Sequence, residues 1–219
     1  MNIVDRTTNF LVAALKSYGP SGVKKFLWDK EFSGTKWDFI DNTVEDCVYP
    51  NLEKYARNGS ILDLGCGPGN TANELPAREY RSYIGVDISA AALDKARKRT
   101  LESGRENKNL FVQADFIKYS PNQRFDVILF RESIYHVPIA KIKETLDHYA
   151  KYLNREGVFI VRLDLSDFNN GGKNKRRPTA MVEVMESEFD LVERHEYTGV
   201  SRPNVLVLRP KTRRPHFES

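Results

Sequence analysis

Residues 61–70 read Ile61-Leu62-Asp63-Leu64-Gly65-Cys66-Gly67-Pro68-Gly69-Asn70, and this stretch decides the fold. It opens with short apolar residues, which are typical of a buried strand. Three glycines follow at alternate positions, and residues 71–77 then predict a helix. A strand, a glycine-rich loop and a helix in this order place a ligand at the C-terminal edge of a parallel sheet. Glycine is required there because the backbone must turn tightly and approach the ligand without an intervening Cβ.

The spacing of the glycines separates this loop from a dinucleotide-binding loop. The dinucleotide fingerprint is G-x-G-x-x-G, which sets a pyrophosphate on the N-terminus of a helix. Here the spacing is G-x-G-x-G, with Pro68 inside the loop and Asp63 two residues before the first glycine. A carboxylate repels a phosphate and attracts an ammonium group. The pattern therefore disfavours a dehydrogenase and favours a ligand that carries an ammonium group.

The motif Asp63-x-Gly65-x-Gly67-x-Gly69 resembles the first motif of the class I S-adenosylmethionine-dependent methyltransferases. S-adenosylmethionine is a sulfonium with an amino-acid tail and an adenosine, and it has no phosphate. The resemblance implies S-adenosyl-L-methionine as the cofactor and S-adenosyl-L-homocysteine as the product. It also implies cofactor contacts from Asp63, Gly65, Cys66, Gly67 and Gly69.

Residues 83–87 predict a second strand, which ends in Asp87, eighteen residues after Gly69. A carboxylate at the end of the second strand can accept a hydrogen bond from each of two ribose hydroxyls. We therefore expect Asp87 and its neighbour Ile88 to bind the cofactor. The alternative is that Asp87 is only a solvent-facing residue at a strand end.

Residues 110–116 predict a third strand that also ends in an acid, Asp115, followed by Phe116. The resemblance implies that Asp115 accepts a hydrogen bond from the adenine amino group and that Phe116 packs on the ring. An amine donor needs an acceptor and a flat ring needs an apolar face. The alternative for Phe116 is ordinary core packing.

The richest chemical cluster follows the fourth predicted strand, 125–130, and reads Arg131-Glu132-Ser133-Ile134-Tyr135-His136-Val137. In the resembled family the end of this strand faces the reacting methyl group. His136 has the unperturbed pKa best suited to a general base. Glu132 is a candidate to orient or deprotonate an amine, and Tyr135 to bond the substrate or line the cofactor. The alternative for His136 is to cap the next helix or pack under a lid.

Arg131 is expected to bind the cofactor, with a substrate carboxylate or a surface position as alternatives. The form Glu132-x-x-Tyr135 is also similar to small-molecule N-methyltransferases of the nodulation type. Amino-methylating DNA enzymes of the family carry an Asn/Asp-Pro-Pro-aromatic motif after the fourth strand, where this chain has Arg131-Glu132-Ser133-Ile134. Neither Cys47 nor Cys66 is placed as the nucleophile of a cytosine-C5 enzyme. A small-molecule substrate is the reading that remains.

The rest of the chain completes the fold prediction. Helices are predicted at 139–153 and 180–188, and strands at 158–164, 191–197 and 205–208. The resulting order matches the class I methyltransferase sheet from about residue 45 to 210. We therefore predict an α/β, Rossmann-like three-layer sandwich with a mostly parallel seven-stranded sheet and a terminal antiparallel strand pair.

The first residues predict a helical cap ahead of this core. A helix is expected at 7–17, a break at 17–22, and a second helix at 43–56. The aromatic residues between them follow no clear period, so they form either a lid or a packing segment. We expect residues 1–44 to be the cap and 45–219 the core domain. The candidates for the substrate pocket are Tyr18, Trp28, Trp37 and, at the end of the fifth strand, Asp164.

Composition limits the remaining classes. The chain has 219 residues, a net charge of +4 and 40% hydrophobic residues, which fits one globular domain. No run of about 18 apolar residues and no secretory signal occurs, so we expect no membrane association. Two cysteines make neither a disulfide framework nor a metal site, which favours a cytoplasmic protein. We expect a monomer or homodimer without a metal.

Basic residues gather at 173–177 and at 209–214. Neither cluster is interleaved with aromatic residues as a nucleic-acid groove would be, so we expect solvated surface and nucleic acid is an unlikely partner. Two alternatives stay open. One is an RNA or protein methyltransferase that uses these clusters, and the other is a non-catalytic adenosylmethionine-binding module.

Overall fold

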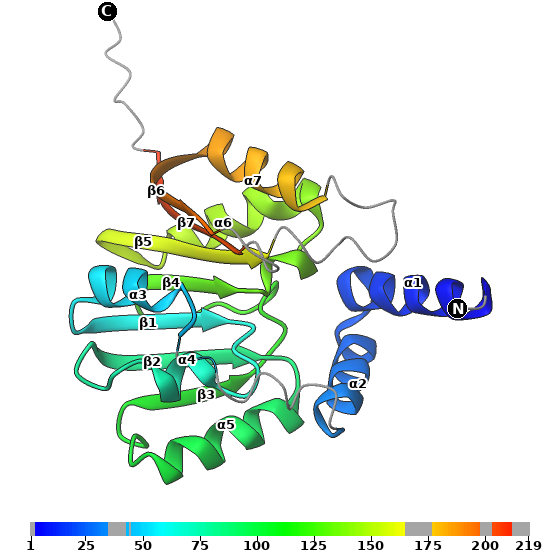
Figure 1. Cartoon of the computed structure of the whole chain (residues 1–219), viewed down its shortest axis with the longest axis horizontal. Helices are drawn as coiled ribbons and strands as arrows, with labels where there is room; N and C mark the ends of the chain where they lie inside the picture. Colours follow the sequence, from blue (N-terminus) through cyan, green and yellow to red (C-terminus); the bar gives the residue numbers. More distant parts are fainter. Residues whose placement is uncertain (1–2, 35–42, 44, 165–176, 198–202, 212–219) are drawn as a thin grey trace, which may run out of the picture.

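A computed structural model describes residues 3–34, 43, 45–164, 177–197 and 203–211 (Figure 1). Its centre is a seven-stranded sheet. The strands are β1 Gly59–Leu64, β2 Tyr80–Asp87, β3 Asn109–Gln113, β4 Phe125–Arg131, β5 Leu153–Asp164, β6 Phe189–Glu196 and β7 Pro203–Pro210. Their order in the sheet is β3-β2-β1-β4-β5-β7-β6. The first five run parallel, and β7 pairs antiparallel with both β5 and β6.

Helices cover both faces of the sheet. They are α3 Tyr49–Ala56, α4 Asn70–Glu74, α5 Ala90–Glu102, α6 Ile142–Ala150 and α7 Arg177–Glu188, with short 3-10 turns η2 Ile134–His136 and η3 Ile139–Lys141. One core cluster joins the sheet to α3, α4 and α5, and the other joins it to η2, α6 and α7. These are the three layers of the predicted α/β sandwich, and the predicted fold class is confirmed.

Alternation along the central strands creates the two cores. Successive side chains of a strand point to opposite faces. Ile61 packs with the α3–α5 cluster, while Leu62 and Leu64 pack with the α6–α7 cluster. All three are fully buried. Because β1 is covered on both faces, it reads as an apolar run rather than as an alternating one.

The order of the strands positions the site. The chain crosses to opposite sides from β1, since β2 lies on one side and β4 on the other. The loops that leave β1 and β4 therefore diverge at the C-terminal edge and open a crevice, as in other sheets of this topology. The helices α1 Ile3–Tyr18 and α2 Ser21–Phe32, here called the cap helices, lie at that edge (Figure 1).

Several predicted boundaries are wrong. Residues Ser21–Phe32 form a full helix that the sequence reading missed, because the aromatic side chains of α2 do not follow one helix face. The helix predicted at 43–56 begins only at Tyr49, with Pro50 in its first turn, and Asp46 to Val48 form a turn instead. The third strand ends at Gln113, so Asp115 and Phe116 lie in the loop beyond it.

Candidate active site

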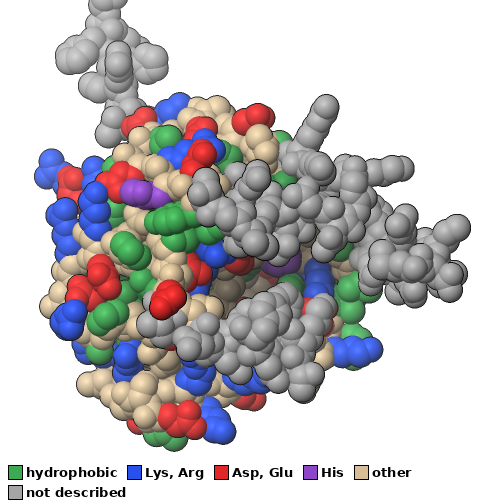
Figure 2. All heavy atoms as spheres, viewed as in Figure 1, with side chains coloured by type: hydrophobic (Ala, Val, Ile, Leu, Met, Phe, Trp, Pro, Cys, Tyr) green, Lys and Arg blue, Asp and Glu red, His purple; other side chains and the backbone are tan. Residues whose placement is uncertain are grey.

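A cavity of about 770 Å³ lies at the C-terminal edge of the sheet, between the sheet and the cap helices. Figure 2 shows this face hollowed, with acidic, basic and histidine side chains near the hollow. Fourteen of the residues predicted for the site line the cavity: Trp28, Asp63, Gly65, Cys66, Gly67, Asp87, Ile88, Asp115, Phe116, Arg131, Glu132, Tyr135, His136 and Asp164. A volume of this size suits a cofactor together with a small substrate.

Three predicted residues are not placed at the cavity. The side chain of Tyr18 is 65% exposed, and the residue does not line the cavity, so its assignment to the substrate pocket is wrong. Tyr18 stands at the last position of α1 and faces solvent rather than the sheet. Trp37 lies outside the described residues. Gly69 does not line the cavity either.

Gly69 has a packing role instead of a ligand contact. Its φ is +75°, and a Cβ at this position would lie 2.7 Å from the Cβ of Ala96. The glycine lets the start of α4 approach α5 closely, which is the usual role of the third glycine in such loops.

The first two glycines shape the loop over the sheet edge. Gly65 N–H and Cys66 N–H both donate to the carbonyl of Val86, at 2.7 and 3.1 Å, so the loop folds back onto β2. Gly65 has φ +82°, and a Cβ there would lie 2.5 Å from the Cβ of Ser133. Gly67 has φ +53°, and a Cβ there would lie 3.7 Å from Cζ of Phe32 in α2. Side chains other than hydrogen would strain both positions.

Asp63 lines the cavity and has one carboxylate oxygen without a described hydrogen-bond partner. Its Oδ2 accepts a hydrogen bond from the hydroxyl of Tyr83 at 2.6 Å. Its Oδ1 is buried and has no hydrogen-bond partner among the described residues. Burial raises the pKa of Asp63 to about 6, although Tyr83 and the nearby Arg131 lower it. An orphaned buried acceptor of this kind calls for a donor from a ligand.

Asp87 is held by the backbone around it. Its Oδ2 accepts from Gly67 N–H and its Oδ1 from Ser89 N–H, both at 2.9 Å. Burial raises the pKa of the carboxyl, and these backbone donors act in the opposite direction. Each carboxylate oxygen keeps a further lone pair, so the pair can still accept from two hydroxyl donors of a ligand.

Asp115 is bonded by α2. Its Oδ2 accepts from Ser21 Oγ at 2.9 Å and lies 3.3 Å from Nζ of Lys24. Its Oδ1 accepts from Ile117 N–H at 3.2 Å. Phe116 lies beside it, 9% exposed, and meets Phe130 edge-to-face at 6.0 Å. Phe116 therefore both lines the cavity and belongs to the core, and its packing on the adenine ring stays a prediction.

The loop after β4 brings polar groups to the other end of the cavity. Glu132 has φ +56°, and its N–H donates to the carbonyl of Arg162 at 2.9 Å. Its carboxylate forms an ion pair with the guanidinium of the same residue. Burial raises the pKa of Glu132, and Arg162 opposes that effect.

Two aromatic residues of η2 complete this end. The hydroxyl of Tyr135 donates to the carbonyl of Asp164 at 2.7 Å, and burial raises the pKa of Tyr135. The ring of His136 meets Trp28 of α2 edge-to-face at 5.0 Å. His136 thus packs under a cap helix, while still lining the cavity.

Sequence reasoning missed Asp46 and Arg162. Asp46 Oδ2 lies 2.9 Å from Arg131, and its Oδ1 lies 3.4 Å from Nε of Arg162. Arg131 and Arg162 are 85 and 116 positions from Asp46 along the chain, so no local sequence pattern predicts these contacts. The only signal was the position of Arg131 and Arg162 at adjacent strand ends, which the register of β4 and β5 pairs directly.

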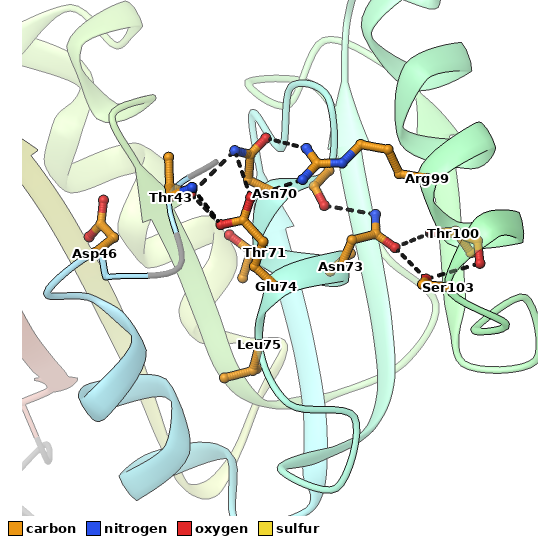
Figure 3. Close-up of polar contacts among 12 residues, drawn as sticks. Thr43, Asp46, Asn70, Thr71, Asn73, Glu74, Leu75, Arg99, Thr100 and Ser103 are labelled. Atoms are coloured by element: carbon orange, nitrogen blue, oxygen red, sulfur yellow. Dashed lines mark hydrogen bonds and ion pairs between the residues drawn. The ribbon is translucent and has the colours of Figure 1, made fainter. Parts of the chain in front are cut away.

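A second polar network holds the segment before α3 against the glycine loop (Figure 3). The carboxylate of Glu74 accepts from the hydroxyl of Thr43 at 2.6 Å, the amide of Asn70 at 3.2 Å and the guanidinium of Arg99 at 2.9 Å. Thr43 and Asn70 also line the cavity. The network therefore fixes the cavity wall beside α4.

Comparison with known proteins identifies the family. A model described as "Methyltransferase domain" matches residues 37–200. The chain belongs to the class I S-adenosylmethionine-dependent methyltransferases. The family expected from the glycine motif is confirmed, and with it the class of cofactor that the fold takes.

Curated relatives of this methyltransferase act on different acceptors. Among them are 27-O-demethylrifamycin SV methyltransferase of Amycolatopsis mediterranei, 27% identical over 51% of this chain, and trans-aconitate 2-methyltransferase of Escherichia coli, 33% identical over 47%. The mRNA cap guanine-N(7) methyltransferase of Schizosaccharomyces pombe is 29% identical over 53%. The alignments cover 44%, 38% and 36% of these relatives, so the chain spans less than half of their length.

Solved structures share the fold of this methyltransferase. The N-methyltransferase NodS of Bradyrhizobium japonicum WM9, in complex with S-adenosyl-L-homocysteine, superposes with a TM-score of 0.66 at 17% identity, over 86% of this chain and 98% of its own. Magnesium protoporphyrin IX methyltransferase of Synechocystis PCC 6803, with bound S-adenosylmethionine, gives 0.60 at 17% identity, over 92% and 96%.

The residues of this methyltransferase fit the cofactor of its family. The unsatisfied Oδ1 of Asp63 suits the ammonium of the amino-acid tail, and Asp87 suits two hydroxyls. The loop N–H groups of Gly65 and Cys66 both donate to Val86 O and are therefore not free to bind a phosphate. Both observations agree with a cationic ligand and not with a dinucleotide.

Two further findings concern the part of the chain that the structure covers. None of its helices is long and apolar enough to cross a membrane. Within the same residues, no group of three histidine, cysteine or acidic side chains is arranged to hold a metal ion.

Proposed function

We propose that this chain transfers a methyl group from S-adenosyl-L-methionine to a nitrogen or oxygen atom of a small-molecule acceptor. The observation that carries the proposal is the row of three carboxylates, Asp63, Asp87 and Asp115, which stand at or near the C-terminal ends of three adjacent strands and line one cavity. Glu132, Tyr135 and His136 line the continuation of the same cavity. The cofactor and a second reactant therefore have room side by side.

In this proposal each carboxylate binds one part of the cofactor. Asp63 accepts from the ammonium, and the guanidinium of Arg131 pairs with the carboxylate of the amino-acid tail. Asp87 accepts from the ribose hydroxyls, with Ile88 against the ring face. Asp115 accepts from the adenine amino group. When bound, S-adenosylmethionine supplies an electrophilic methyl carbon on a sulfonium.

The residues of the chain contribute mainly by positioning. In-line displacement needs the nucleophile, the methyl carbon and the sulfur on one line, and it needs water excluded. Trp28 and His136 pack together over the cavity and shield it. Because its pKa is raised, Tyr135 stays protonated at neutral pH, so it positions groups rather than acting as a base. Glu132 and His136 are the candidate bases, and Asp164 lines the acceptor end.

The choice of a small acceptor follows from the cap helices. They lie at the C-terminal edge of the sheet, and residues of both α2 and the sheet edge line a cavity of about 770 Å³. Two of the relatives named above are called after small-molecule acceptors. The division into a cap of residues 1–44 and a core of 45–219, a cytoplasmic location and a monomeric or homodimeric state belong to the same proposal. The two free cysteines support the location.

The test is a methyl-transfer screen that measures release of S-adenosyl-L-homocysteine. Three pools are compared: small amines, phenols, alcohols and carboxylic acids; total RNA with capped and uncapped transcripts; and a protein extract treated with nuclease. Turnover confined to small molecules is the expected result. Turnover of RNA or protein would replace the proposal with that alternative. Cofactor binding without turnover of any pool would favour the non-catalytic module.

A further inference from the structure

We propose that the methyl acceptor is an amine and that the carboxylate of Glu132 binds its nitrogen. This inference rests on the proposed function and narrows it to one class of acceptor. It starts from the geometry of a single residue. Glu132 stands at the end of β4, next to the loop of Gly65, and lines the cavity.

The backbone of Glu132 is held in a strained conformation. A non-glycine residue in the left-handed region costs roughly 1–2 kcal/mol, and such strain persists where the surroundings impose it. Here the N–H of Glu132 donates to Arg162 O at 2.9 Å, continuing the β4–β5 ladder. The next residue, Ser133, packs against Gly65. These two contacts turn the Glu132 side chain toward the cavity rather than along the strand.

An ion pair also holds the carboxylate of Glu132 in place. Arg162 forms an ion pair with Glu132, and Nε of the same guanidinium lies 3.4 Å from Asp46. Asp46 also accepts from the backbone N–H of Val48 at 3.0 Å. The guanidinium of Arg162 therefore lies between two carboxylates, those of Glu132 and Asp46. The side chain of Glu132 nevertheless stays 38% exposed, and the cavity is what it faces.

The charges at this end favour a cationic or hydrogen-donating acceptor. The ionised groups facing Glu132 are Arg162 and Asp164 on β5, with the hydroxyl of Tyr135 on η2. The guanidinium of Arg162 forms ion pairs with both Glu132 and Asp46. This end of the cavity therefore has two guanidinium groups and three carboxylates: Arg131, Arg162, Asp46, Glu132 and Asp164. An acceptor that carries a carboxylate at this position would meet net repulsion.

Basicity separates an amine from an alcohol. An aliphatic hydroxyl is about as weak an acid as water, with a pKa of ~16, so a carboxylate cannot usefully deprotonate it. An alkylammonium has a pKa of ~10, and its neutral form is already nucleophilic. The raised pKa of Glu132 brings the carboxylate closer to that range. A carboxylate is thus a suitable partner for an amine and a poor one for an alcohol.

The transfer step balances with Glu132 as the proton acceptor before the methyl moves. The substrate ammonium passes one proton to the carboxylate of Glu132, which frees the lone pair of the nitrogen. That lone pair forms the new N–C bond while the S–C bond breaks and leaves its electron pair on sulfur. The methylated nitrogen leaves as an ammonium, and Glu132 returns its proton to the solvent. No oxidant, reductant or further reactant is needed.

The experiment measures binding of three matched probes in the presence of saturating S-adenosyl-L-homocysteine. Phenethylamine, phenethyl alcohol and phenylacetate share one ring and differ in the terminal group. Ligand-observed NMR gives their affinities for wild type, Glu132→Gln, Glu132→Asp and the control Glu144→Gln. Glu144 is an exposed carboxylate on α6 whose side chain is 76% exposed. Aspartate suits a left-handed backbone, so Glu132→Asp preserves the charge without added strain.

We expect wild type to bind the amine roughly tenfold more tightly than the alcohol, and phenylacetate not at all. Glu132→Gln should lose this preference, Glu132→Asp should keep part of it, and Glu144→Gln should leave it unchanged. Each variant must first bind S-adenosyl-L-homocysteine, which reports a folded cofactor site. The proposal is overturned if the alcohol or the acid binds best, if Glu132→Gln keeps the preference, or if no probe binds. Failure of wild type to bind S-adenosyl-L-homocysteine would instead overturn the proposed function.

Discussion

The surroundings of Asp63 give the most direct evidence on the charge of the ligand. One of its oxygens is bonded to Tyr83, while the other is buried without a described partner. Burial raises its pKa to about 6, above the usual 3.8 of an aspartate. Ionisation therefore lowers the stability of the unligated fold as the pH rises from about 3.8 to about 6. A bound ammonium would reverse that cost, because it stabilises the ionised form.

Binding of S-adenosyl-L-homocysteine should accordingly depend on pH. The ligand needs ionised Asp63, so its affinity should fall by up to about tenfold per pH unit below about pH 6, and level off above it. Asp63→Asn should bind roughly tenfold to a hundredfold more weakly and show a flatter profile. Calorimetric titrations from about pH 5 to about pH 8 measure both effects. A steep profile retained in Asp63→Asn would assign the titration to another group.

Gly65 gives a second prediction at the same scale. Alanine there combines a φ of +82° with a Cβ 2.5 Å from Ser133, so we expect Gly65→Ala to lose about 2–4 kcal/mol of unfolding free energy. Gly104→Ala is the matched control, since Gly104 has φ +65° and nothing within 4 Å of a Cβ. The control should lose only about 1 kcal/mol. Urea denaturation compares the two, and equal losses would show that Ser133 yields without cost.

At the scale of elements, the cap helix α2 is hydrogen-bonded to the N-terminus of α5. Asp29 accepts from Ser89 Oγ at 2.8 Å and from Ala91 N–H at 3.3 Å, at the N-terminus of α5. Burial alone would raise the pKa of Asp29, but hydrogen bonds from Lys25, Ser89 and Ala91 outweigh it and lower the pKa. The charge thus favours docking at neutral pH, where the helix terminus attracts an anion.

Asp29→Asn should loosen this docking and speed the release of S-adenosyl-L-homocysteine roughly tenfold, with a smaller change in the association rate. Trp28 lines the cavity and provides a fluorescence signal for stopped-flow measurement. Asp94→Asn is the control, because Asp94 is a 75% exposed carboxylate on the same α5. An unchanged release rate in Asp29→Asn would mean that α2 does not retain the ligand.

The end of α3 offers a prediction about stability alone. Arg57 closes this helix with φ +47° and ψ +47°, a left-handed conformation that glycine adopts without steric cost. Its guanidinium makes one exposed bond, to Lys54 O at 3.1 Å. Arg57→Gly should therefore raise the unfolding free energy by about 0.5–1 kcal/mol. Thermal denaturation measures the change in stability, and the cofactor affinity should be unchanged. A loss of stability would show that the contact with Lys54 stabilises the fold more than the left-handed conformation of Arg57 destabilises it.

At the scale of the whole molecule, the sequence predicted those features of the fold that depend on local patterns of residues. Short apolar runs and the glycine loop identified the central strands, so the order of elements and the three layers followed. Asp63 was found from its place two residues before the first glycine of the loop, and Asp87 and Asp115 because each ends a predicted strand. Their shared edge is a consequence of parallel pairing, which needs no knowledge of side-chain contacts.

What could not be predicted depends on contacts distant in sequence. Asp46 meets Arg131 and Arg162 only because a turn before α3 comes to the ends of β4 and β5. Glu74 gathers Thr43 and Arg99 in the same way. The helix α2 was missed because its aromatic side chains do not share one face: Trp28 and Phe32 line the cavity, while Phe26 is exposed. Tertiary contacts stabilise such a helix more than its own periodicity does.

The central claim is that the carboxylates at the C-terminal edge of the sheet bind the cofactor. The most direct test is calorimetric titration of wild type and Asp87→Ala with S-adenosylmethionine, S-adenosyl-L-homocysteine and NAD. We predict that both adenosyl ligands bind wild type, that NAD does not, and that Asp87→Ala loses roughly 1–3 kcal/mol of binding free energy. Folded wild-type protein that binds neither adenosyl ligand, or that binds NAD instead, would contradict the account.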